Sequence, residues 1–382
     1  MTEPASGRPP LRIGIVGAGM IATVKPGFLP GLQHIRDKAE VVAITSRTRS
    51  RAEAVARDWA IPAVYDSLPE MLADASLDAV LNLTPIYAHY ETSLEVLTAG
   101  VHLVTEKPLA STLAQAGELC ALAAANNLLV VCAPYEMLKP EWAEARRLIS
   151  AGVVGKVAFA RLQSSHGGPA AMAWPADPTW FYQEGAGPLL DMGVYGIDRI
   201  TGLLGPARRV AALSGLNQPV RYARGGAFDG LEITATVDDN TLLLLDFGEA
   251  TFAVIDATFN VLASKSAALE LYGAAGTIIV NRPGVTASPG GLSLELFRAD
   301  AVAGLPGWIT PSSLDAQPPQ DRTALLARAI LVEHLADCLA NGTPLVTGPD
   351  RARHVLEIML AAQTAAREGR TVELETTFVA AG

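Results

Sequence analysis

The sequence has few cysteines and fewer basic than acidic residues. Cys120, Cys132 and Cys338 are far apart and form no CxxC or Cys/His cluster, which argues against a disulfide framework or a zinc site. We therefore expect ordinary buried thiols and no bound metal. The 39 acidic residues outnumber the 29 basic ones and give a formal net charge of -10, so nucleic acid is not expected as a partner.

Long apolar runs are also missing. No apolar segment reaches the length of a membrane span without Gly, Pro or charge, and MTEPASGRPP lacks the apolar centre of a signal peptide. We expect a cytoplasmic protein without membrane contact and with a flexible tail over residues 1–10. Half of the 382 residues are hydrophobic, so the chain can form large cores, and its length favours two domains.

The segment 11–22 is typical of a strand followed by a nucleotide-binding turn. LRIGIV is apolar and β-branched, and GAGMIA places Gly17, Gly19 and Ala22 in the pattern G-x-G-x-x-G/A. Gly17 permits the tight turn, Gly19 lets the backbone approach a pyrophosphate, and Ala22 lets the helix pack on the sheet. Free N–H groups at the helix start would face the phosphates, so we expect a dinucleotide site.

Strand-like and helical segments then alternate to about residue 135. Further strands are expected at 41–47, 77–85, 101–108 and 128–134. This alternation predicts a doubly wound parallel sheet, and hence a dinucleotide-binding Rossmann domain over 11–135. Pro26-Gly27 falls inside the first expected helix and should shorten or kink it.

The end of the second expected strand bears on the choice of cofactor. An NAD site usually has Asp or Glu there for the ribose hydroxyls, whereas this chain has Thr45-Ser46-Arg47-Thr48 with Arg49 and Arg51 nearby. A carboxylate would repel a 2′-phosphate, but Ser46, Arg47 and Arg51 could hold one. We therefore expect NADP in preference to NAD. The alternative is that the arginines form a solvated helix start and NAD binds.

The pattern changes after residue 135. Strand-like segments with short turns predict a large, mainly antiparallel sheet in a second α/β domain over 136–382. We expect this domain to bind substrate and to form oligomers, because a broad apolar sheet favours association as a homodimer or homotetramer. Helical patterns at 321–342 and 350–369 each end in Gly, and these C-terminal helices (321–370) could pack back on the first domain.

The loop 164–187 is rich in Gly, Pro and aromatic residues. Trp180 and Tyr182, with Phe181 between them, are expected either to form an apolar platform for a sugar ring or to fill a crevice. His166 is expected either to hydrogen-bond a substrate hydroxyl or to be a structural loop residue.

The helix that begins near residue 187 carries Asp191, Tyr195 and Asp198 at spacings of four and three, which puts them on one side of a regular helix. A helical wheel predicts that they flank the buried stripe. That stripe is predicted to consist of Leu190, Val194 and Ile197.

Four segments in order, GIVGAGMIA, TPIYAHYE, AGVHLVTEKPLA and GAGPLLDMGVYGID, resemble the Gfo/Idh/MocA proteins, the family of glucose–fructose oxidoreductase and inositol dehydrogenase. The resemblance covers about residues 11 to 372. It implies an N-terminal Rossmann domain and a C-terminal α/β domain whose large, mainly antiparallel sheet often forms an oligomer interface.

The resemblance also implies roles for single residues. Glu106 and Lys107 match the family's EKP, whose lysine lies between nicotinamide and substrate and is usually catalytic. Asp191 matches the aspartate that holds a substrate hydroxyl. Tyr195 stands where many members have a histidine acid/base. A tyrosine at this position resembles the glucose–fructose oxidoreductase and dihydrodiol dehydrogenase branches. These matches predict catalytic roles for Lys107, Tyr195 and Asp191.

Thr84, Pro85 and His89 match the segment that flanks the cofactor. Two positions depart from the family pattern, since Ala186 replaces the middle glycine of GGG and Met137 stands where members commonly have Arg or another polar group. The cofactor-binding residues are predicted to be Gly17, Gly19, Met20, Ile21, Ser46, Arg47, Arg51, Thr84, Pro85, His89, Glu106 and Lys107.

Together these features predict an NAD(P)-dependent oxidoreductase acting on a hydroxyl or keto carbon of a sugar, polyol or related cyclic alcohol. A base must take the hydroxyl proton as hydride leaves, and a lysine cation beside Tyr195 would make phenolate more accessible. The sequence does not decide between Lys107 and Tyr195 as that base. Asp198 is expected to bind substrate or to position Tyr195. The alternatives are a redox-assisted glycosidase or lyase with tightly held cofactor, and a non-catalytic sugar or nucleotide sensor.

Overall fold

The computed structural model describes residues 9–24, 26–281, 293–302, 305–309, 311 and 321–380. Most of the tail predicted to be flexible, residues 1–8, lies outside the described residues. Packing divides the chain into two compact units. The first contains the described residues of Met1–Lys139 and Gln317–Leu356, and the second those of Pro140–Ala316 and Glu357–Ala380.

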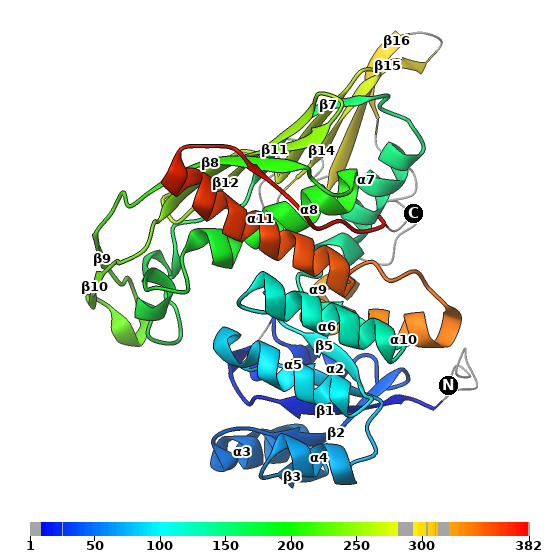
Figure 1. Cartoon of the computed structure of the whole chain (residues 1–382), viewed down its shortest axis with the longest axis vertical. Helices are drawn as coiled ribbons and strands as arrows, with labels where there is room; N and C mark the ends of the chain where they lie inside the picture. Colours follow the sequence, from blue (N-terminus) through cyan, green and yellow to red (C-terminus); the bar gives the residue numbers. More distant parts are fainter. Residues whose placement is uncertain are drawn as a thin grey trace. The chain divides into compact units, whose positions relative to one another are not determined.

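The first unit is built on a six-stranded parallel sheet, which confirms the predicted doubly wound fold (Figure 1). The strand order is β3-β2-β1-β4-β5-β6, so the direction of winding changes between β1 and β4. Ligands of such sheets bind outside the carboxyl ends of the strands at this point. The strands are β1 (Leu11–Val16), β2 (Ala39–Thr45), β3 (Ala63–Tyr65), β4 (Ala79–Asn82), β5 (His102–Thr105) and β6 (Val130–Cys132).

Helices cover both faces of this sheet. Ile13 and Ile15 point into one core together with residues of α2 (Phe28–Leu32), α3 (Arg49–Trp59) and α10 (Ile330–Asn341). Between them Gly14 faces the other way, and a Cβ on it would lie 2.6 Å from Leu77. The opposite face is packed against α4 (Leu68–Asp74), α5 (His89–Thr98) and α6 (Leu113–Ala125). Residues from near the C-terminus therefore complete the core of the first unit.

The first helix is short, as the Pro26-Gly27 pair predicts. Helix α1 covers only Met20–Thr23, and α2 starts at Phe28. The turn after β1 is therefore followed by a single helical turn.

The second unit is built on a nine-stranded sheet in which all neighbouring strands are antiparallel except β7 and β12. The predicted large, mainly antiparallel sheet is therefore confirmed. In spatial order its strands are β16 (Leu305–Ile309), β15 (Leu294–Val302), β14 (Gly276–Val280), β13 (Leu269–Gly273), β7 (Val157–Gln163), β12 (Thr251–Thr258), β11 (Asn240–Gly248), β8 (Arg209–Gly215) and β17 (Val372–Glu373). A separate hairpin pairs β9 (Val220–Tyr222) with β10 (Glu232–Thr234).

The two faces of the large sheet differ. Helices α7 (Pro140–Ser150) and α8 (Val194–Leu204) lie along one face (Figure 1). Along β11 and β12 buried side chains alternate with exposed ones, as expected for a half-buried sheet. The exposed set is largely apolar and includes Leu242 and Leu244 on β11 and Phe252 and Val254 on β12. The other face of the sheet therefore presents apolar side chains.

The C-terminal helical runs end at glycines as predicted, but the first run is interrupted. It forms α9 (Asp321–Leu326) and α10, and Ala327 between them has a φ of 45°. Helix α11 (Pro349–Glu368) is followed by Gly369, whose φ is 63°.

All three cysteines are buried free thiols, as predicted. Burial raises the pKa of Cys120 to about 12 and that of Cys338 to about 11.

Within the described part of the chain, no helix is both long enough and apolar enough to cross a membrane. The described side chains also bring no three His, Cys, Asp or Glu residues together in a way that could hold a metal ion.

Candidate active site

The turn after β1 contains two glycines, Gly17 and Gly19, and the protein around them constrains only the first. Gly17 has a φ of +113°, and a Cβ there would lie 2.6 Å from the carbonyl oxygen of Leu83, so the fold itself requires glycine. A Cβ on Gly19 would meet no protein atom within 4 Å. The fold leaves Gly19 open, which fits a phosphate ligand that must approach the backbone closely. Met20 and Ile21, 36% and 37% exposed, follow directly.

The turn after β4 is shaped by a buried asparagine that the sequence analysis did not single out. Asn82 Nδ2 donates hydrogen bonds to the carbonyl of His89 and to Ser93 Oγ. Its Oδ1 accepts from the backbone N–H of Thr84 at 3.2 Å and from Thr84 Oγ1 at 2.7 Å. Asn82 thereby fixes the turn that carries Thr84 and Pro85.

His89 joins this turn to the next one. Its Nδ1 lies 2.7 Å from the carbonyl oxygen of Pro108, and its Nε2 lies 2.9 Å from that of Thr84. The two carbonyls favour the charged ring, but burial outweighs them and lowers the pKa of His89. His89 is 1% exposed and lies between the backbones of two loops, and its neutral ring donates to only one of the two carbonyls. In this structure His89 is therefore not presented to a ligand as predicted.

The turn after β5 carries the EKP segment. Glu106 is 8% exposed, and its Oε2 accepts from the backbone N–H of Lys107 at 3.2 Å. Its Oε1 accepts from Arg328 Nε at 2.9 Å, and Arg328 Nη1 also donates to the carbonyl of Pro26 at 3.0 Å. Arg328 therefore ties the EKP turn to the segment that follows the glycine turn. No sequence pattern identified Arg328, because 222 residues separate it from Glu106.

The arginines after β2 are not equivalent. Arg49 Nε donates to Glu53 Oε1 at 2.8 Å, and its Nη1 pairs with Asp66, so two carboxylates compensate its charge. Arg47 and Arg51 are exposed, and Arg47 Nη1 donates to the hydroxyl of Tyr87 at 3.2 Å. Ser46 is half-buried beside them. The exposed charges nearest the end of β2 are therefore guanidinium groups.

In the second unit, Asp191 and Tyr195 lie on a helix that is not regular. Leu189–Gly193 forms one π-helical turn, and α8 begins at Val194. Such turns often occur at functional sites. Asp191 and Tyr195 are both half-buried.

The structure corrects two predictions made with a regular helical wheel, the first of them because of the wide turn. Leu189, 5% exposed, is buried in the stripe where Leu190 was predicted. Asp198 is 3% exposed and lies on the packed side instead of flanking the stripe, so its burial does not support the predicted substrate contact. The extra residue in the turn changes the direction of Leu189 and Leu190 relative to α8. Asp198 lies within the regular α8, four residues after Val194, and so shares the buried side of Val194.

The aromatic segment of the loop separates into an exposed and a buried part. Trp180 is 49% exposed and packs edge-on against Phe181. Tyr182 is 1% exposed, its hydroxyl accepts from the N–H of Ala170 at 3.0 Å, and its ring packs against Phe259. Burial raises the pKa of Tyr182. Tyr182 is therefore a core residue and not part of a sugar platform, whereas Trp180 remains accessible.

His166 has a defined orientation. Its Nδ1 accepts a hydrogen bond from the backbone N–H of Gly168 at 2.8 Å, and its ring stacks on Phe259 at 5.3 Å. Because a backbone N–H only donates, Nδ1 must be unprotonated and the neutral ring carries its proton on Nε2. His166 is therefore a hydrogen-bond donor through Nε2.

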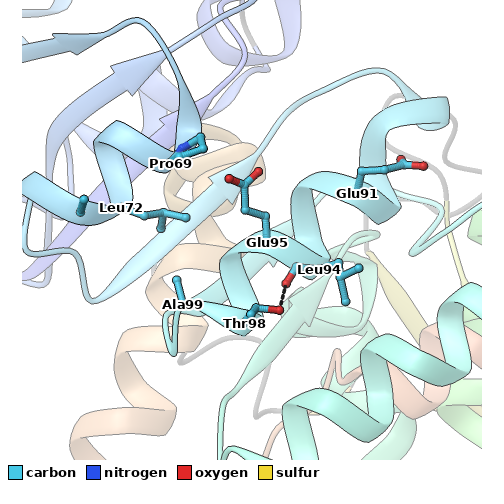
Figure 2. Close-up of a pocket in the computed structure, with 8 residues that line it drawn as sticks. Pro69, Leu72, Glu91, Leu94, Glu95, Thr98 and Ala99 are labelled. Carbon is cyan, nitrogen blue, oxygen red and sulfur yellow. Dashed lines mark hydrogen bonds between the residues drawn. The ribbon is translucent and has the colours of Figure 1, made fainter.

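Two cavities differ in how near they lie to these side chains. A groove of about 590 Å³ runs between α4 and α5, and Figure 2 shows Glu91 and Glu95 beside it and the hydrogen bond from Thr98 to the Leu94 carbonyl. It contains none of the predicted site residues. A cavity of about 210 Å³ lies beside the loop of His166, and its polar lining comes from Gln218, Arg221, Tyr222, Arg224 and Asn260.

Comparisons with known proteins match both units. Residues 11–133 match the family model "Oxidoreductase family, NAD-binding Rossmann fold", and residues 142–279 match "GFO/IDH/MocA C-terminal domain". The chain is 24% identical over 370 residues to scyllo-inositol 2-dehydrogenase (NAD(+)) of Bacillus subtilis, covering 95% of this chain and 94% of that protein. It is 31% identical over 199 residues to D-glucoside 3-dehydrogenase of Escherichia coli, covering 51% and 54%.

A solved structure has the same fold. The aldose–aldose oxidoreductase from Caulobacter crescentus, crystallised with glycerol, superposes with a TM-score of 0.74 over 96% of this chain and 100% of that one. The sequences are 21% identical, so this likeness bears on the fold alone.

We predict that Arg328→Gln lowers the free energy of unfolding by about 3 kcal/mol, because it leaves the buried Glu106 carboxylate without its cation. Arg322→Gln is the matched control, since the Arg322 side chain is 46% exposed in its pair with Glu333 and should contribute under about 1 kcal/mol. Denaturant unfolding measures both. Equal, small losses would show that Arg328 does not hold the EKP turn.

Proposed function

Because the chain belongs to the Gfo/Idh/MocA family of NAD-binding oxidoreductases, we propose that it is a dehydrogenase or reductase acting on a hydroxyl or keto carbon of a sugar, polyol or related cyclic alcohol. The observation that carries the proposal is that the chain has both the lysine after β5 and the Asp191–Tyr195 pair on an irregular helix. The relatives named for inositol and glucoside oxidation support this substrate class.

The first unit fits a dinucleotide. The open position of Gly19, the turns fixed by Asn82 and His89, and the switch point between β1 and β4 together suit a pyrophosphate bound across the strand ends. When bound, the nicotinamide ring would supply or accept the hydride. Thr84, Pro85 and Glu106 would flank it, and Lys107 would stand on the turn that Glu106 holds.

Side chains of the protein would transfer the proton and position the substrate. In the oxidation direction, the substrate hydroxyl gives its proton to Tyr195 or Lys107 as the C–H bond is broken, and in reduction the same group returns it. Asp191 accepts a hydrogen bond from a neighbouring hydroxyl and thereby selects the carbon that reacts. His166 donates through Nε2 to another substrate oxygen, and the exposed face of Trp180 covers an apolar face of the ring.

We expect Lys107→Ala to lower kcat by about 100-fold or more, because proton transfer typically contributes 10²–10⁴. Dinucleotide affinity should change little. Lys139→Ala is the control, since Lys139 Nζ pairs with Glu136 at 2.9 Å and has no proposed role. Turnover is measured with both cofactors on a panel of sugars, polyols and glycosides. Wild-type turnover in Lys107→Ala would contradict the role, and glycoside cleavage without net reduction of added cofactor would favour the redox-assisted alternative.

We also propose a preference for NADP over NAD. It is supported by Arg47 and Arg51, which are exposed beside Ser46, and by the absence of a carboxylate at positions 45–48.

Arg47→Ala should weaken NADP binding about tenfold and leave NAD binding nearly unchanged, because only NADP carries the 2′-phosphate. Arg57→Ala, in the last turn of α3, is the control. Titration of both cofactors measures this, and wild-type affinity for NAD equal to or better than that for NADP would overturn the preference.

We propose further that the chain forms a homodimer or homotetramer through the uncovered sheet face. Cytoplasmic location likewise stays a prediction. Leu244 pairs with Val254 across β11 and β12, and Leu242 pairs with Leu213 across β11 and β8. All four side chains are between 42% and 77% exposed, so they form a contiguous apolar patch.

Leu244→Glu should shift the protein toward monomer, because association would bury an unpaired carboxylate. Leu325→Glu, at a 45% exposed position on α9, should leave the assembly unchanged. Light scattering on purified protein gives the mass of each. A wild-type monomer would contradict this proposal.

A further inference from the structure

The helix that carries Asp191 contains a side chain inserted into its backbone hydrogen bonds. Met192 and Gly196 are four residues apart, so in a regular α-helix the Met192 carbonyl would accept directly from the Gly196 N–H. Here the hydroxyl of Ser164 lies between them. It accepts from the Gly196 N–H at 3.0 Å and donates to the Met192 carbonyl. Ser164 thus bonds both backbone groups at the point where the π-helical turn ends, and the Met192 carbonyl also accepts from the Val194 N–H.

The position of this hydroxyl is well fixed. Ser164 directly follows β7 and is 2% exposed, and its N–H donates to Asp256 Oδ1 at 2.7 Å. The helix is shaped to receive it, because a Cβ on Gly196 would lie 3.0 Å from Ser164 Cβ and 2.8 Å from Ile255 Cγ2. The serine and the glycine are therefore two separate features of the sequence that suit the same backbone arrangement.

The insertion lies between the two functional side chains along the helix. Asp191 is within the wide turn, and Tyr195 is in the first turn of α8. Side chains that insert into the backbone hydrogen bonds of a helix are a known cause of local distortion, as are π-helical turns. If the hydroxyl were absent, the Met192 carbonyl could bond the Gly196 N–H directly and the turn could close to α-helical geometry. One residue of register corresponds to about 100° of rotation, so Asp191 would then point elsewhere relative to Tyr195.

We propose that Ser164 is a positioning residue: its hydroxyl keeps the 189–193 turn wide and so sets the direction of Asp191 relative to Tyr195. The catalytic consequence of this arrangement rests on the function proposed above, whereas the geometry does not. Ser164 touches neither substrate nor cofactor in this role. It acts only through the helix backbone.

The chain offers a matched control in the next residue. Ser165 is also buried, 3% exposed, and its Oγ accepts from the backbone N–H of Thr258 at 3.1 Å. Ser165→Ala therefore removes a buried serine hydroxyl from the same segment without touching the helix. Ser164→Ala removes the inserted hydroxyl, and Ser164→Cys replaces it with a weaker donor and acceptor of similar shape.

The first readout is structural and independent of activity. Crystal structures of Ser164→Ala and Ser165→Ala should show a direct bond between Met192 O and Gly196 N, with a regular α-helical turn, in the former only. Ser164→Cys serves in its place if Ser164→Ala does not fold, and should show a lengthened contact and a partly closed turn. A 189–193 turn that stays wide without the hydroxyl would overturn the proposal, even if no substrate has been found.

The second readout is kinetic. Ser164→Ala should lower kcat/KM on the best substrate by on the order of 100-fold, while the Kd of the dinucleotide and the melting temperature stay near wild type. Ser165→Ala should stay within about threefold, and Asp191→Asn should cost much less in the Ser164→Ala background than in wild type. Wild-type kinetics in Ser164→Ala, or full additivity with Asp191→Asn, would overturn the proposal. Lack of turnover by the wild type would refute the proposed function and leave the structural readout to decide this one.

Discussion

One buried imidazole joins the two turns on which the chemistry of the first unit depends. The ring of His89 lies between the carbonyls of Thr84 and Pro108, and so connects the turn after β4 with the turn that carries Lys107. A neutral imidazole carries one N–H, so it donates to one of these carbonyls, and only the charged ring donates to both. The turn that carries Lys107 thus lies against His89, eighteen residues earlier in the chain.

The same principle operates in the second unit. There the backbone of the helix with Asp191 is completed by Ser164, a residue of a neighbouring strand end. In both units a small polar side chain outside the catalytic set satisfies backbone groups next to it. Buried hydrogen bonds of this kind have few alternative geometries, so they suit the positioning of reactive groups better than apolar packing does.

The alternating pattern of the first third was sufficient to predict the doubly wound sheet, because buried parallel strands are nearly continuous apolar runs. It missed β3, whose three half-buried residues give no periodic signal. Motif matching singled out Glu106 and Lys107 but could not identify Arg328, since its pair with Glu106 arises only from folding. The helical wheel failed at Leu190 because it assumes 3.6 residues per turn throughout, and no sequence pattern predicts a hydroxyl inserted from another strand. Asp198 lies four residues after Val194 in a regular helix, and the wheel treated it as exposed because it is charged.

The central claim is that a carbohydrate or polyol exchanges hydride directly with a bound dinucleotide. It is tested most directly by incubating the protein with a substrate deuterated at its carbinol carbons and analysing the dinucleotide by mass spectrometry. Deuterium is expected on the nicotinamide ring, either in free cofactor or in cofactor released by denaturation. Oxidation of the substrate with deuterium found only in solvent, or no transfer from any sugar or polyol, would contradict it.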